Sequence, residues 1–130
     1  MATYKEFEKY IKANYNLVPE SNRDLMAIGF NLPNGRSQLV FLERGGSDTF
    51  GEVAHVLSFL GELTGKKLEK ALEETWKLNA GGLVKIGDKI AYRCSIILAD
   101  VDESEIDKSI AIAAAGGDYL EKTFTGEDNH

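Results

Sequence analysis

Two short turns constrain this chain more than any other feature of its sequence. Pro33-Asn34-Gly35 and Gly87-Asp88 each separate two runs of apolar residues, and both consist mainly of residues that turns favour. Strands joined by such short turns run antiparallel, because a parallel pair needs a long crossover connection. The sequence therefore predicts β-hairpins and an α+β domain with a mainly antiparallel five-stranded sheet.

The strands are predicted from apolar residues that alternate or run continuously between turn residues. They cover Met26 to Leu32, Gln38 to Arg44, Glu52 to Leu63, Leu83 to Ile86 and Lys89 to Leu98. The segment from Arg44 to Asp48 contains Gly45-Gly46 and is predicted to be a loop.

Three helices are predicted from apolar residues at spacings of three and four. The first covers about residues 4–14, behind a capping box made by Thr3 and Glu6. The second follows Thr64, with its apolar stripe running to Asn79, and the third opens on Asp102. The expected order is α-β-β-β-α-β-β-α in a single domain, residues 1–130, with residues 125–130 expected to fray.

Gly116-Gly117 interrupts the last predicted helix with two residues that each cost about 1 kcal/mol relative to alanine. Two interpretations are open. The helix either kinks or breaks at these glycines, or their missing side chains permit the close approach of another element, within the domain or across a dimer.

Charge and composition exclude several classes of function. The net charge is −6, and the segment from Ala99 to His130 alone carries −7. Binding to nucleic acid needs clustered Lys and Arg, and the densest basic spot is Lys66-Lys67 with Lys70. No apolar run approaches the ~20 residues that span a bilayer, and the first residues lack the apolar stretch of a signal peptide. We expect a cytoplasmic protein without nucleic-acid or membrane partners.

The residues that could carry chemistry have structural explanations. His55 lies mid-strand among apolar residues and is expected to be a partly buried strand residue, not a general base or pH sensor. Cys94 is the only cysteine, so it excludes an internal disulfide, and it is expected to be buried. The acidic residues from Asp100 to Asp107 coincide with a helix start, which carboxylates stabilise. We expect no enzyme activity, no metal site and no cofactor.

Several strands carry apolar residues on both parities, such as Leu39 and Phe41 on one and Val40 and Leu42 on the other. If the helices cover one face of the sheet, the other remains as an apolar surface, which is typical of an interface. Alternatively, the helices divide between both faces and bury everything. The candidate residues for a partner or dimer interface are Leu39, Phe41, Val56, Leu60, Trp76 and Ile97.

The stretch from Leu68 to Phe124 carries the most specific pattern. An apolar helix ends in Leu78-Asn79 and Gly81-Gly82, and a short hairpin with a Gly-Asp turn follows. The last helix opens on an aspartate and closes on Asp118-Tyr119-Leu120. With the order of elements, this pattern resembles the class I type III secretion chaperone fold and the related YbjN-like family of sensory transduction regulators.

The resemblance implies a homodimer that binds a polypeptide. In the chaperone branch, an extended segment of the partner wraps around apolar patches. The resemblance carries over no catalytic residue. We therefore expect a non-enzymatic, chaperone-like protein-binding domain. The alternatives are a regulatory or adaptor protein of the YbjN-like type without a chaperone client and, third, a small enzyme or ligand-binding domain.

Overall fold

The structure of the chain is a computed structural model that describes residues 3–18 and 25–125. Its elements are α1 (Tyr4–Asn14), β1 (Leu25–Asn31), a 3-10 turn η1 (Pro33–Gly35), β2 (Ser37–Ser47), β3 (Gly51–Gly61), α2 (Gly65–Thr75), β4 (Gly82–Ile86), β5 (Lys89–Ile97) and α3 (Glu103–Phe124). The predicted order and the α+β class are confirmed. Residues 126–130, most of the tail that was expected to fray, lie outside the described residues.

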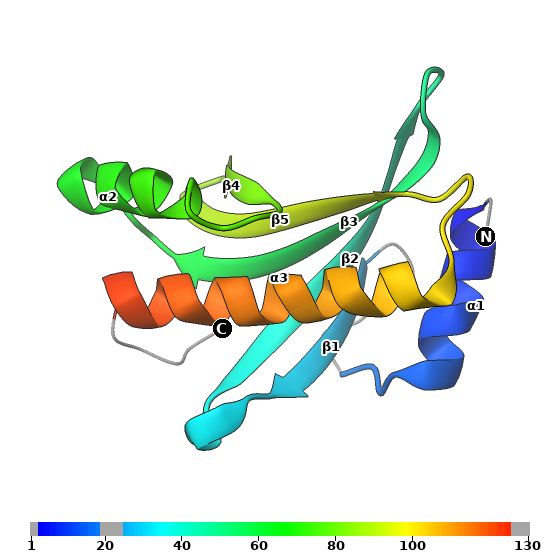
Figure 1. Cartoon of the computed structure of the whole chain (residues 1–130), viewed down its shortest axis with the longest axis horizontal. Coiled ribbons are helices and arrows are strands. Elements are labelled where there is room, and N and C mark those ends of the chain that lie inside the picture. Colours follow the sequence, from blue (N-terminus) through cyan, green and yellow to red (C-terminus); the bar gives the residue numbers. More distant parts are fainter. Residues whose placement is uncertain (1–2, 19–24, 126–130) are drawn as a thin grey trace.

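The five strands form one antiparallel sheet in the spatial order β1-β2-β3-β5-β4 (Figure 1). The β2–β3 hairpin is the longest, and its tip projects beyond the rest of the sheet (Figure 1). The loop predicted from Arg44 to Asp48 is wrong for most of its length, because Gly45 pairs with Val53 and Gly46 with Glu52. The strand has a glycine at position 45 for a steric reason, since a Cβ there would overlap the imidazole of His55.

All three described helices pack on the same side of the sheet. The long helix α3 crosses β2, β3 and β5, while α1 and α2 lie near the opposite ends of α3 (Figure 1). The core fills the space between α3 and the sheet. It consists mainly of the even-numbered strand residues together with Tyr4, Phe7 and Ile11 of α1 and Ile106, Ile110, Ala113 and Leu120 of α3. No described helix has the length and apolar character needed to cross a membrane.

Helix α3 continues through Gly116 and Gly117, so the prediction of a kink or break is wrong and the prediction of a close approach is right. A Cβ on Gly116 would lie 2.5 Å from the ring of Tyr92, and one on Gly117 would overlap the side chain of Ser58. The two glycines therefore let the helix backbone lie directly on β5 and β3.

Helix α2 departs most from its prediction. It ends at Thr75, whose hydroxyl donates a hydrogen bond to the Ala71 carbonyl at 2.7 Å, so the helical stripe does not reach Asn79. Within α2 only Ala71 and Thr75 are buried, and Leu72 is exposed. So few residues of α2 are buried because α3 covers the middle of the sheet, and α2 contacts the edge of the sheet at β4.

Candidate protein-binding surfaces

Seven large apolar side chains are exposed on the described part of the chain, and they form two separate groups. Phe50, Ile86 and Ile97 lie on the side of the sheet away from the helices, whereas Leu72, Trp76, Ile112 and Tyr119 lie in the helical layer. We name the first region the sheet face. It comprises Leu39, Phe41, Glu43, Phe50, His55, Phe59, Ile86, Arg93, Ser95 and Ile97, and Leu57 is on the same side of the sheet but is buried. The second region, the Trp76 groove, comprises Leu72, Trp76, Leu78, Ile112 and Tyr119.

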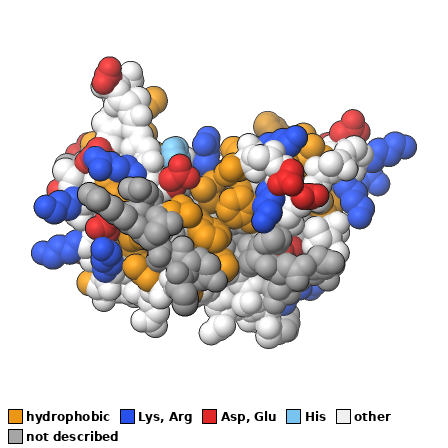
Figure 2. All heavy atoms as spheres, turned by 180° about the vertical axis from the view of Figure 1, so that it is seen from behind, with side chains coloured by type: hydrophobic (Ala, Val, Ile, Leu, Met, Phe, Trp, Pro, Cys, Tyr) orange, Lys and Arg blue, Asp and Glu red, His pale blue; other side chains and the backbone are white. Residues whose placement is uncertain are grey.

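The sheet face has no described helix over it, as expected if the helices cover one side only. Figure 2 shows hydrophobic side chains gathered across the middle of this face. Leu39 and Phe41 are half-buried, and the rings of Phe41 and Phe59 meet edge to face at 5.5 Å. Ile97 is 52% exposed. Three of the six candidate interface residues therefore lie together on this face.

Val56 and Leu60 do not belong to any surface, and their assignment to an interface is wrong. Their side chains are 0% and 1% exposed. Successive residues of a strand point to opposite faces. The even-numbered positions of β3 therefore face α3, and the odd-numbered positions, such as His55, face away from it.

A hollow of about 330 Å³ lies at the hairpin end of the sheet face. Its lining includes Phe50, Val53 and Ile97, with His55 and Ser95 as the polar pair. His55 Nδ1 lies 2.8 Å from Ser95 Oγ. Burial and the nearby Arg93 guanidinium lower the pKa of His55, which favours the neutral imidazole at pH 7.

The His55–Ser95 contact resembles that between a catalytic base and a nucleophile, which in a hydrolytic triad also requires a group that orients the base. No carboxylate among the described residues hydrogen-bonds to the imidazole, although Glu43 pairs with His55 across β2 and β3. A base without an orienting group does not make a hydrolytic triad.

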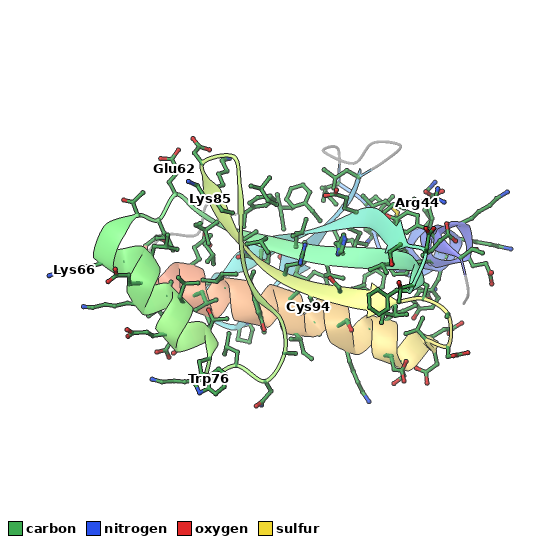
Figure 3. All side chains as sticks on the ribbon, turned by 90° about the horizontal axis from the view of Figure 1, so that it is seen from above. Arg44, Glu62, Lys66, Trp76, Lys85 and Cys94 are labelled. Atoms are coloured by element: carbon green, nitrogen blue, oxygen red, sulfur yellow. The ribbon has the colours of Figure 1, made fainter. Side chains whose placement is uncertain are left out.

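The Trp76 groove consists of two adjoining hollows of about 330 and 370 Å³ that share Leu78. The ring of Tyr92 lines the first hollow, and its hydroxyl donates a hydrogen bond to the Ala80 carbonyl. Tyr119 donates to the Glu74 carboxylate at 2.5 Å, which ties the α3 side of the groove to α2. Trp76 is 90% exposed and projects outward beyond the end of α2 (Figure 3).

The remaining candidates have structural roles. Cys94 is buried on the helix side of β5, and burial raises the pKa of its thiol, so it is a poor nucleophile. In the acidic segment, Asp102 and Glu105 form a reciprocal capping box at the start of α3. Asp107 accepts hydrogen bonds from the hydroxyls of Tyr10 and Tyr15 at 2.8 and 2.6 Å. Among the described residues no His, Cys, Asp and Glu side chains gather into a possible metal site.

Several surface residues were not anticipated, although one signal was present. The buried stripe of α3 runs through Ile106, Ile110 and Ala113, and Ile112 and Tyr119 fall outside it. Large apolar residues off the buried stripe of a helix mark its exposed side as a contact surface. No signal predicts Phe50, because its exposure depends on how far the β2–β3 hairpin projects.

No protein-family model matches this chain, and no curated protein matches it.

Proposed function

We propose that this chain is a non-enzymatic, chaperone-like protein-binding domain of the cytoplasm, which forms a homodimer and holds a polypeptide partner against apolar surface. The observation that carries the proposal is the separation of the exposed apolar side chains into two regions on opposite sides of the sheet. Exposed apolar surface of this kind marks sites of protein interaction. Two such regions on opposite sides allow one to hold a second copy and the other to hold the partner.

The Trp76 groove is the proposed site for the polypeptide. Two adjoining hollows suit neighbouring apolar residues of one segment. Tryptophan and tyrosine are the residues that most often dominate binding energy at interfaces, and Trp76 and Tyr119 frame this groove. The occupant is therefore a segment with two apolar side chains close in sequence, one for each hollow.

The fluorescence of Trp76 can report on binding in the groove, because Trp76 is the only tryptophan of the chain. Proteins captured by the tagged full chain from its source cells are identified after crosslinking, and peptides covering the crosslinked segment are titrated into the chain. Tryptophan fluorescence is expected to shift to shorter wavelength as the ring leaves water. Ile112→Asp, in the same groove, is expected to weaken peptide binding at least tenfold.

The matched control is Phe50→Asp, an equally drastic change at an exposed apolar residue outside the groove. It is expected to leave peptide binding unchanged. Peptides that bind Ile112→Asp as tightly as the unaltered chain, or that leave the fluorescence unchanged, contradict the proposed site. A captured region that is a folded domain favours the adaptor alternative instead, whereas an unfolded segment favours the chaperone-like function.

A further inference from the structure

Three strands of the sheet face align their side chains in rows across the sheet. The register places Phe41, Leu57 and Arg93 in one row across β2, β3 and β5. The next row contains Glu43, His55 and Ser95, and the one after it contains Gly45, Val53 and Ile97. The strand β3 thus forms the middle line of the face, with β2 and β5 on either side.

Opposite charges flank this middle line. Glu43 lies on β2 and Arg93 on β5, one row apart, and both side chains are exposed. Strand β3 lies between their strands, with His55 in the row of Glu43 and Leu57 in the row of Arg93. In a twofold interface residue i of one copy meets residue j of the other and j meets i, so an acid and a base on opposite sides of β3 can each meet the opposite charge of a second copy.

We infer that the sheet face binds a second copy of the chain, packed face to face about a twofold axis parallel to β3. This arrangement rests on the homodimer of the proposed function and assigns the surface that forms it. The axis lies between the two sheets, so β2 of each copy lies over β5 of the other. Sheets packed in this way lie about 10 Å apart, and their inner side chains interdigitate.

The charges select this axis over its alternative. With the axis parallel to β3, Glu43 of the second copy lies over Ser95, which is about 7 Å along the strand from Arg93. Extended glutamate and arginine side chains span that offset, so two equivalent ion pairs form, one on each side of β3. An axis across the strands would instead place β2 over β2 and β5 over β5, and would separate the opposite charges.

The side chains of β2 and β5 are also complementary in shape across the proposed interface. Gly45 of the second copy lies over Ile97, in the same row. The imidazole of His55 occupies the place that a side chain at Gly45 would take. The exposed Ile97 of each copy therefore packs against the flat ring of the other copy's His55, and the hollow beside Phe50 is covered.

The test is a charge-reversal cycle on the full chain, with the dimer dissociation constant measured by sedimentation velocity. Each of Glu43→Arg and Arg93→Glu alone is expected to weaken the dimer about tenfold or more, because each creates two like-charge contacts. The double variant restores opposite charges in reversed order and is expected to recover most of the lost affinity. Lys85→Glu, a charge reversal on the helix side of the edge strand β4, is the control and is expected to have no effect.

Two outcomes overturn the inference: a chain that stays monomeric at 100 µM (about a hundred times a micromolar dissociation constant), or a double variant that dimerises no better than the single variants. Circular dichroism checks that the variants fold, and both positions are exposed. The proposed peptide site fails separately. A monomeric chain that still binds peptide in the Trp76 groove removes the homodimer and its sheet-face interface but leaves the peptide site, and a dimer that binds no peptide removes the groove alone.

Discussion

The two faces of the sheet both carry apolar side chains, but they differ in burial and in the polar residues among them. The face under α3 is largely buried, and its buried polar side chains on the strands are Gln38 and Ser58. The other face mixes half-buried aromatic rings with Glu43, His55, Arg93 and Ser95. A core tolerates no charge without a buried partner, whereas a surface that is also an interface uses charges to fix orientation. The difference shows that polar residues on a strand, more than its apolar ones, identify the face left for a partner.

The largest expected contrast comes from deleting one side chain on each face. Leu60→Ala, under α3, is expected to lower the free energy of unfolding by about 2–5 kcal/mol, since it leaves a cavity in the core. Ile97→Ala, on the other face, is expected to change the stability of the monomer by less than about 1 kcal/mol. Urea denaturation at low protein concentration measures both. Equal losses at the two positions would mean that the sheet face is part of the core.

The second prediction concerns the contact between α3 and the covered face. Gly117→Ala is expected to destabilise the chain by about 1–3 kcal/mol, because the new methyl group overlaps Ser58 and outweighs the gain in helix propensity. Adding Ser58→Gly makes room for the methyl group and should recover part of the loss in a double-mutant cycle. Gly82→Ala is a control, since a Cβ there meets no neighbour within 4 Å.

The third prediction concerns the tyrosines that hold α1 against α3. Burial and the hydrogen bond to Asp107 raise the pKa of Tyr10 to about 12. The folded state holds the phenol proton of Tyr10 more tightly than the unfolded state does. The contribution of this proton to the free energy of unfolding is therefore complete below pH 10 and is lost as the pH rises to about 12. In Asp107→Asn, Tyr10 should ionise at lower pH, as measured by absorbance at 295 nm. A titration curve unchanged by this substitution would show that the contact does not persist in solution.

The smallest effect is expected at His55, on the uncovered face. Burial and Arg93 lower the pKa of His55, while Glu43 opposes the shift. The folded state therefore favours the neutral ring, and the stabilisation is present above pH 6.5 and declines as the pH falls through the lowered pKa. Stability measured between pH 7.5 and 5 should fall less steeply in His55→Gln. If both chains show the same slope, the imidazole does not contribute to the pH dependence.

Most of the fold follows from local signals. The turn at Gly87-Asp88 and the cap at Asp102 are short-range features, and both lie where the sequence places them. Gly45 and the end of α2 could not be predicted in the same way, since they depend on long-range contacts. Gly45 lies in a strand through its pairing with Val53, where its missing side chain leaves room for the imidazole of His55, and α2 ends where it leaves the edge of the sheet.

The candidate site was predicted less well than the fold. Leu39, Phe41 and Ile97 were placed on an uncovered face because the apolar pattern of the strands has two sides. Val56 and Leu60 were included wrongly, because alternation shows that two faces exist without showing which one the helices cover. That choice depends on the path of α3, which no residue of the strands encodes locally.

The position of β5 beside β3 has a consequence for the order of events during folding. The strands β1, β2 and β3 join through short local connections, whereas β5 reaches β3 only after β3 has been followed by α2 and β4. Closing this longer loop costs more chain entropy than closing a hairpin, so β5 is expected to dock late. The row of Glu43, His55 and Ser95 is complete only once β5 is paired with β3. A nascent chain therefore lacks the proposed dimer surface until its sheet is complete, and we expect association through this surface to be restricted to molecules that have finished folding.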